Sequence, residues 1–294
     1  MITLPEYLKI CDTDGNLAEL ITLIVAQAVP IRDAFISNQD CADSKNSSGE
    51  TQTKMDTWSD KHIINILEKS KMVRQVASEE HDDIVQLNKA AKYSVVMDPL
   101  DGSSLVKANL CVGTIIGIYE GNCLQAGKNL KAAFYILYGP MTTVTVTVGN
   151  GVAVFVLNKN GEYQMLKNNI KIPEGNLYGS GGIRTEWLGK HAKFINRIEN
   201  EGAKIRYSGA FVADFHQILQ YGGIYAYPPS EKQPDGKLRL VFEVNPIGFL
   251  AEQAGGAVSN GETSTLEIVP TKLHQRTVVY VGSYGMITKI ENTQ

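Results

Sequence analysis

The chain has few cysteines, and they are widely spaced. Cys11, Cys41, Cys111 and Cys123 form no Cys-x-x-Cys pair. A disulfide scaffold needs a denser spacing, and a structural zinc site usually needs ligands two to four residues apart. We therefore expect reduced thiols in a cytoplasmic protein.

An excess of one charge is also missing, since 28 Lys+Arg stand against 31 Asp+Glu, a formal net charge of −3. A protein that binds nucleic acid or an anionic membrane typically carries a large basic excess. We therefore expect neither as a partner. Charged residues such as Glu6, Lys9 and Asp12 interrupt the first residues, so we expect no signal peptide.

Long apolar helices are absent as well, although residues 132–158 carry no charge. Gly139-Pro140 and residues 149–151 interrupt this stretch, and threonine and valine alternate up to Val148. A period of two followed by a turn predicts a β-hairpin rather than a membrane helix.

The 294 residues, 43% of them hydrophobic, are enough for one large or two medium domains. Helical and strand patterns alternate along the chain, so the fold class is mixed α/β. The polar segment 37–53 predicts a loop, and residues 167–175 predict a connection between halves 1–170 and 171–294. The expected helices cover 17–31, 58–71, 188–200, 211–221 and 247–254. The expected strands cover 93–97, 112–119, 142–157 (a hairpin), 238–243 and 277–281.

The most informative segment runs Asp98-Pro99-Leu100-Asp101-Gly102-Ser103-Ser104, directly after the apolar run 93–97. Proline cannot continue a central strand, so the strand should end at Asp98. Two carboxylates at a strand end suit Mg²⁺, and a helix beginning at 102–104 could hold a phosphate. The alternative is a plain strand–turn–helix corner with aspartate in the turn and serine as the cap.

Further acidic residues precede this segment. Ser78-Glu79-Glu80-His81-Asp82-Asp83 has four acids in five positions, which alone indicates a solvated loop. If the strand at 93–97 returns beside it, Glu79 and Glu80 would meet Asp98 and Asp101, and like-charge repulsion would then require cations. Asp56 and Asp60 stand near a predicted helix start, where capping is the alternative role, especially for Asp60.

In the second half, Lys237 and Arg239 precede Glu243. Two basic side chains and an acid on one strand could bind an anionic substrate beside a metal. The alternative is an edge strand whose charges face solvent.

Together, DPLDGSS, SEE, GKLRL, E-x-N-P, AEQAGG and PTKLHQR resemble fructose-1,6-bisphosphatase of the sugar phosphatase family, over nearly the whole chain. The resemblance implies a layered α/β/α/β/α sandwich with a metal-binding, regulatory-type half and a sugar-bisphosphate-binding half. It implies a phosphoric monoester hydrolase of gluconeogenesis that converts D-fructose 1,6-bisphosphate to fructose 6-phosphate and phosphate. Two or more Mg²⁺ would be bound per site, with Mn²⁺ or Zn²⁺ able to substitute, and the protein would be a homotetramer.

The resemblance also implies residue roles. Asp56 and Glu80 match the acids that activate the attacking water. The matching metal ligands are Glu79, Glu80, Asp98, the Leu100 carbonyl, Asp101 and Glu243. The matching substrate-binding positions are Asp101, Gly102, Ser103, Ser104, Arg206, Tyr207, Tyr227, Lys237 and Arg239. Arg206 matches an arginine that reaches the distal phosphate from a neighbouring subunit.

Two other functions stay open from the sequence: a sedoheptulose-1,7-bisphosphatase or dual-specificity bisphosphatase, and a non-catalytic regulatory homologue. The chain departs from the family pattern at Ser180-Gly181-Gly182, where most members have Asn-Glu-Gly, and at Leu105-Val106-Lys107 in place of Asn-Ile-Asp. The first difference leaves distal-phosphate binding looser or rebuilt.

A further departure concerns regulation. Regulated members bind AMP at an early helix start through threonines, a Lys-Tyr pair and an arginine. Here Lys92-Tyr93 is kept, but Asp14 and Ala18 stand at the threonine positions and Glu120 at the arginine position. We therefore expect weak or no AMP inhibition, unless Lys128 or Lys131 replaces the arginine.

Overall fold

The computed structural model of the chain describes residues 1–38, 41–45 and 51–294. The helices are α1 (Leu4–Ile10), α2 (Gly15–Val25), α3 (Ala28–Ala34), α4 (Lys54–Ser70), α5 (Gly189–Asn200), α6 (Phe211–Tyr221), α7 (Asn245–Gln253) and α8 (Tyr284–Glu291). The strands are β1 (Cys41–Lys45), β2 (Thr51–Thr53), β3 (Val73–Ser78), β4 (Val85–Gln86), β5 (Tyr93–Asp101), β6 (Val112–Glu120), β7 (Ala132–Tyr138), β8 (Thr142–Thr147), β9 (Ala153–Leu157), β10 (Tyr163–Lys167), β11 (Leu177–Ser180), β12 (Lys204–Ile205), β13 (Gly223–Tyr227), β14 (Ala257–Ser259) and β15 (Val279–Gly282).

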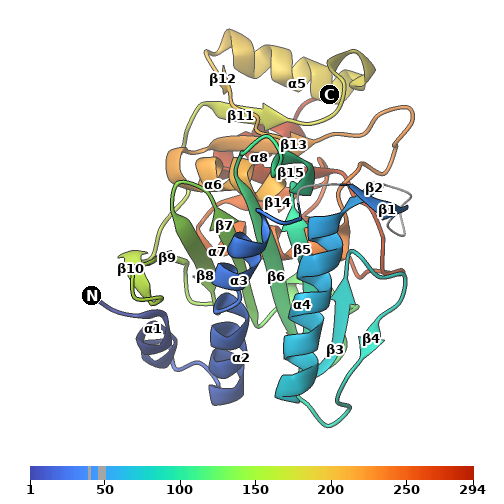
Figure 1. Cartoon of the computed structure of the whole chain (residues 1–294). Helices are drawn as coiled ribbons and strands as arrows, with labels where there is room; N and C mark the ends of the chain where they lie inside the picture. Colours follow the sequence, from blue (N-terminus) through green and yellow to red (C-terminus); the bar gives the residue numbers. More distant parts are fainter. Residues whose placement is uncertain (39–40, 46–50) are drawn as a thin grey trace.

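Two mixed sheets organise these elements. The larger has eight strands in the order β10-β9-β8-β7-β6-β5-β3-β4, with β3 and β5 parallel and the other neighbours antiparallel. The smaller has five strands in the order β12-β11-β13-β15-β14. Helices α1–α4 cover the outer face of the larger sheet, α6 and α7 lie between the sheets, and α5 and α8 cover the smaller sheet (Figure 1). The expected α/β/α/β/α sandwich is confirmed.

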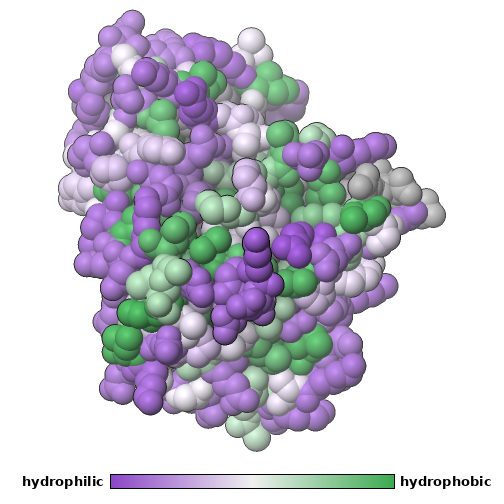
Figure 2. Space-filling model, turned by 60° about the vertical axis from the view of Figure 1, so that its left-hand side comes forward, coloured by the Kyte–Doolittle hydropathy of each residue, from purple (hydrophilic) through white to green (hydrophobic). Residues whose placement is uncertain are grey.

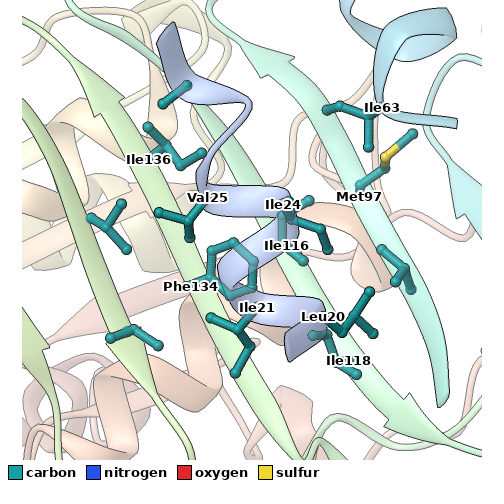
Figure 3. Close-up of a cluster of buried hydrophobic side chains, with 14 of the residues drawn as sticks. Leu20, Ile21, Ile24, Val25, Ile63, Met97, Ile116, Ile118, Phe134 and Ile136 are labelled. Carbon is teal, nitrogen blue, oxygen red and sulfur yellow. The ribbon is translucent and has the colours of Figure 1, made fainter. Parts of the chain in front are cut away.

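The first core lies between α2 and the larger sheet. Because residues three and four apart share one helix face, Leu20, Ile21, Ile24 and Val25 all point at the strands (Figure 3). Alternate residues of β6 and β7 meet them, and these are Ile116, Ile118, Phe134 and Ile136. The intervening residues face the opposite way, so Ile115, Tyr119 and Tyr135 join the second core around α6 and α7.

The predicted hairpin is confirmed as β8 and β9. Val144 and Val146 of β8 enter the first core, as the period-two pattern requires. Within the part of the chain described above, no helix is long and apolar enough to cross a membrane. On the face drawn in Figure 2, hydrophobic residues lie in small groups separated by hydrophilic ones. Cys11, Cys111 and Cys123 are free thiols, and the Cys41 side chain lies outside the described part.

Three element predictions were wrong. The helix expected over 17–31 is divided into α2 and α3, because the ring of Pro30 would clash with the carbonyl one turn before it in a continuous helix. The segment 37–53, expected to be a loop, contains the paired strands β1 and β2, while 39–40 and 46–50 lie outside the described residues. The strand expected over 238–243 is instead a π-helical turn at Leu240–Val244 that leads into α7.

The fourth difference lies in the DPLDGSS segment. Strand β5 does not end at Asp98 but continues to Asp101. Asp98 pairs with Ile115 and Asp101 with Gly113, so β5 holds one extra residue there, a β-bulge that contains Pro99. The expected helix start is a short 3₁₀ turn at Ser103–Leu105.

Candidate active site

A polar cavity of about 360 Å³ opens where the end of β5 meets α4, α6 and the π-helical turn. Residues from both halves of the chain line it. All but one of the site residues predicted from sequence line it, together with four that were not predicted: Gly209, Phe211, Tyr225 and Leu238. Six of its lining side chains are acidic and two are basic, so the cavity carries an excess of negative charge.

Three carboxylates converge in this cavity. Glu79 follows β3, Asp98 lies in β5, and Glu243 lies in the π-helical turn 145 residues further along the chain. One oxygen from each lies within 4.8 Å of the others. Strand β3 runs parallel to β5, and the Glu79 amide donates to the Met97 carbonyl at 3.1 Å, which brings the two acidic segments side by side. The expected meeting of these segments is confirmed.

Burial sets the protonation of this cluster. It raises the pKa of Asp98 well above its usual range, the pKa of Asp101 to about 7 and the pKa of Glu243 to about 8, and repulsion from Glu79 acts in the same direction. The Arg239 guanidinium lies 2.8 Å from Glu79 and 3.9 Å from Glu243 and offsets part of that repulsion. Buried carboxylates this close are ionised together only beside further positive charge, which a divalent cation supplies. The oxygen-rich donor set fits a hard cation such as Mg²⁺.

Asp101 connects the cluster to the second half of the chain. Its Oδ2 accepts a hydrogen bond at 2.7 Å from the backbone N–H of Val212, in the first turn of α6. Gly102, the next residue, has φ of +79°, and a Cβ there would lie 2.6 Å from the Ala210 side chain. Only glycine fits both this conformation and this close approach. The chain therefore turns tightly enough for Gly102, Ser103 and Ser104 to line the cavity beside the acids.

Asp56 lies at the start of α4, in the same cavity. Its Oδ2 accepts from the Thr53 backbone N–H at 2.7 Å and from the Ser103 hydroxyl at 3.0 Å. Asp56 is thus the acid of a capping box with Thr53 while it also contacts Ser103 across the cavity. The capping role expected for Asp60 was wrong, because Asp60 lies one turn further along and pairs elsewhere.

The opposite end of the cavity is lined by Tyr207, Tyr227 and Lys237. The Lys237 ammonium lies 5.9 Å from the centre of the Tyr227 ring, over its face. Arg206 is the one predicted site residue that does not line the cavity. It is exposed, and its guanidinium donates to the Ile205 carbonyl at 3.1 Å.

Two family models match the chain almost end to end. They are described as fructose-1-6-bisphosphatase, N-terminal domain, over residues 8–168, and fructose-1-6-bisphosphatase, C-terminal domain, over residues 172–294. Their matches leave only the first seven residues and a three-residue connection uncovered.

Individual relatives agree. A protein of Methanocorpusculum labreanum named fructose-1,6-bisphosphatase class 1 is 65% identical over 291 residues, which covers 99% of this chain and 91% of that protein. One of the same name from Methanospirillum hungatei is 53% identical over 99% of this chain and 94% of its own. The structure of Leishmania major fructose-1,6-bisphosphatase in holo form superposes with a TM-score of 0.94 at 29% identity, covering 98% of this chain and 97% of that one.

Proposed function

The chain belongs to the class 1 fructose-1,6-bisphosphatase family, and on that premise we propose that it releases the 1-phosphate of fructose 1,6-bisphosphate at the acidic cavity. The convergence of Glu79, Asp98 and Glu243 carries this proposal, because such a buried carboxylate cluster suits a metal-dependent phosphatase. The products are fructose 6-phosphate and phosphate, and the reaction belongs to gluconeogenesis.

We propose that the cavity binds Mg²⁺, two or more per site, and that Mn²⁺ or Zn²⁺ can substitute. Bound divalent cations supply charge neutralisation for the phosphoryl oxygens and an activated water. The proposed ligands line the cavity together, and they are Glu79, Glu80, Asp98, the Leu100 carbonyl, Asp101 and Glu243.

Other residues of the cavity would accept the proton of the attacking water and bind the phosphate. We propose that Asp56 and Glu80 accept the proton of the attacking water, since both carboxylates line the cavity beside the cluster. Gly102 and Ser103, with Ser104, would hold the 1-phosphate. The hydrogen bond from Ser103 to Asp56 fixes the position of the proton acceptor relative to the residues that would hold the phosphate. Positioning of this kind carries most of the catalysis in phosphoryl transfer, because its transition state is loose.

The sugar and its distal phosphate would occupy the other end of the cavity. Tyr207, Tyr227 and Lys237 offer two phenols and an ammonium there. Arg239 also lines the cavity, but it is buried against Glu79, so we propose that it acts on the substrate from beside the metal site.

The replacement of Asp98 by asparagine tests this function. Asp98→Asn removes one ligand charge and keeps the side-chain shape, so phosphate release from fructose 1,6-bisphosphate with Mg²⁺ should fall at least about a hundredfold. Asp83→Asn is the matched control, because Asp83 is exposed and does not line the cavity. Equal rates for the two variants would contradict the assignment.

We further propose a cytoplasmic homotetramer built from chains with halves 1–170 and 171–294, in which Arg206 completes a neighbour's site. Support comes from the resemblance at Ile205-Arg206-Tyr207 and from the position of β12, an edge strand whose Ile205 is 57% exposed. An edge strand with an exposed apolar side chain is suited to pairing with another chain.

Co-expression of Arg206→Ala and Asp98→Asn chains tests the shared site. If each site takes its arginine from the partner, a pair made of one chain of each variant holds one site in which Asp98 and Arg206 are both present. Random pairing then leaves about a quarter of all sites intact. Activity should then exceed that of either variant alone. No gain on mixing, or a fully active monomer by light scattering, would contradict the proposal.

A further inference from the structure

Glu79 and Glu80 lie in a tight turn that follows β3. The His81 amide donates to the Ser78 carbonyl at 3.3 Å, which closes the turn around the two acids. Within it, the Glu80 amide donates to the Ser78 hydroxyl at 3.3 Å. The positions of both acids therefore depend on how residues 78 and 81 are held.

One carboxylate outside the cavity holds both of those residues. The Ser78 hydroxyl donates to Oδ1 of Asp60 at 2.6 Å, and Nε2 of His81 lies 2.7 Å from Oδ2 of Asp60. Because a carboxylate oxygen accepts, Nε2 carries the proton. Asp60 is only 3% exposed and Ser78 is fully buried, so water does not replace the bond between them, whereas the His81 side chain is 41% exposed.

Asp60 occupies this position because of helical spacing. It lies four residues after Asp56 on α4, hence on the same face of the helix. One face of α4 thus presents Asp56 to the cavity and, one turn later, Asp60 to the turn behind it. From the other half of the chain, His274 Nε2 lies 2.7 Å from the His81 carbonyl and fixes the far end of the turn.

We infer that Asp60 is a positioning residue that holds the turn bearing Glu79 and Glu80 in the geometry that binds the metal. Asp60 does not line the cavity, so it acts through Ser78 and His81 rather than on the substrate. This inference rests on the proposed function in taking Glu79 and Glu80 as metal ligands, and it assigns the function of Asp60 to hydrogen bonding rather than to charge.

Two substitutions of Asp60 distinguish an effect of its hydrogen bonds from an effect of its charge. Asp60→Leu removes both acceptors and keeps the number and branching of the side-chain heavy atoms. Asp60→Asn can keep both hydrogen bonds without the charge. Its oxygen can accept from Ser78, and its NH₂ group can donate to Nε2 of His81 once the ring proton moves to Nδ1. Glu68→Leu is the control, because Glu68 is exposed on the same helix. The readout is Mg²⁺ and Mn²⁺ affinity by calorimetry on the full chain without substrate, with thermal unfolding to verify folding.

We expect Asp60→Leu to weaken the metal affinity about tenfold or more, and Asp60→Asn and Glu68→Leu to stay within about threefold of the parent. Equal losses in Asp60→Leu and Asp60→Asn would overturn the inference in favour of a direct effect of charge. Unchanged affinity in both would overturn it as well. If Asp60→Leu does not fold, Ser78→Ala decides in its place, with an expected loss of about tenfold and an unchanged affinity overturning the inference.

These outcomes do not depend on turnover. A parent protein that binds Mg²⁺ but releases no phosphate from fructose 1,6-bisphosphate would refute the proposed function and leave the role of Asp60 to be judged on affinity. In an active parent, the same variants assayed against Mg²⁺ concentration should show a raised Mg²⁺ requirement, with kcat largely recovered at saturating metal.

Discussion

Gly181 has no side chain because the ring of Tyr227 fills the space that one would need. A Cβ on Gly181 would lie 2.3 Å and 2.4 Å from two ring carbons of Tyr227. The φ of Gly181 is not in the left-handed region, so the requirement is steric rather than conformational. The Trp187 indole N–H donates to the Gly181 carbonyl at 3.0 Å and holds this segment against the ring. The departure of this chain from Asn-Glu-Gly therefore shapes the end of the cavity that Tyr227 lines.

Gly181→Ala should accordingly act on substrate binding. The added methyl group must push the Tyr227 ring toward the cavity, so we expect KM for fructose 1,6-bisphosphate to rise about tenfold with kcat little changed, the signature of lost uniform binding. Steady-state kinetics measures this, with Gly189→Ala as the control because a Cβ on Gly189 meets nothing within 4 Å. A fall in kcat at unchanged KM would show that Tyr227 does not contact the ground-state substrate.

The residues of the site could be predicted from sequence where the motif is contiguous. Asp98, Asp101 and Gly102 stand within five positions, so local geometry alone brings them together. The pairing of Asp60 with His81 could not be predicted, because 21 residues separate them and only the packing of α4 beside β3 joins them. Arg239 was expected to meet substrate directly, and its burial against Glu79 depends on tertiary structure in the same way.

At the scale of elements, the residues around the start of α2 bear on the regulation expected of this chain. Asp14 precedes this helix, and its Oδ1 accepts from the backbone N–H groups of Asn16 and Leu17 at 3.1 Å and 3.2 Å. Its Oδ2 lies 3.3 Å from the Lys92 ammonium, and Glu120 lies 4.0 Å from the same ammonium. The amide groups and the lysine that an AMP phosphate would need are therefore already engaged by carboxylates.

We predict that AMP inhibits this enzyme weakly or not at all. Asp14 at the helix start and Glu120 beside Lys92 repel a phosphate dianion, and the alternative cation Lys128 contacts Glu267 instead. Titration of AMP into the phosphate-release assay measures the effect. The paired variant Asp14→Thr with Glu120→Arg keeps a helix cap and reverses one charge, so it should gain AMP sensitivity at least about tenfold. Half-inhibition of the parent protein at low micromolar AMP would contradict the prediction.

Elements were predictable where periodicity was strong. The predicted range of α6 matches its observed bounds, and β6 differs from its prediction by one residue. The π-helical turn at Leu240–Val244 was not predictable, because a short and wholly buried run has no polar face from which a helix or a strand period can be read. The bulge at Pro99 was missed for a related reason: proline excludes a regular ladder position, but a bulge supplies an irregular one.

At the scale of the whole molecule, the active site is a junction between the two halves of the chain. Asp101 binds the start of α6, Arg239 contacts Glu79, and His274 contacts the His81 carbonyl, so each acidic segment of the first half is held by the second. The second hydrophobic core joins residues of both sheets around α6 and α7. Because one core and one site span both halves, we expect the chain to unfold as one cooperative unit.

Two histidines, His191 which is buried and His216 which is half-buried, should contribute to how the stability of that unit depends on pH. Burial lowers the pKa of His191 to about 3 and the pKa of His216 to about 4. His191 lies between Ser180 and Tyr280, and His216 bonds to the Tyr135 hydroxyl at 2.7 Å, so both are held neutral inside the fold. In the unfolded chain a histidine takes up a proton near pH 6.5.

The lowered pKa values of His191 and His216 make these histidines stabilise the fold less at acidic pH than at neutral pH. Above about pH 6.5 both histidines are neutral in either state, and their contribution to stability is fully present. As the pH falls from 6.5 toward 4, only the unfolded chain gains protons at these two histidines, so their contribution to the free energy of unfolding should fall, by about 2 kcal/mol for each histidine at pH 5. Asp98, Asp101 and Glu243, whose pKa values are raised, bind protons in the folded state over the same range and act in the opposite direction, so a comparison of variant with parent isolates the histidine. Urea unfolding at pH 7, 6 and 5 and one protein concentration measures this. His216→Asn, which retains a polar atom near Tyr135, should be less stable at pH 7 but should lose about 2 kcal/mol less than the parent protein between pH 7 and pH 5. Parallel pH dependences for the two proteins would show that His216 is protonated in the folded state, and thus that its burial does not keep it neutral.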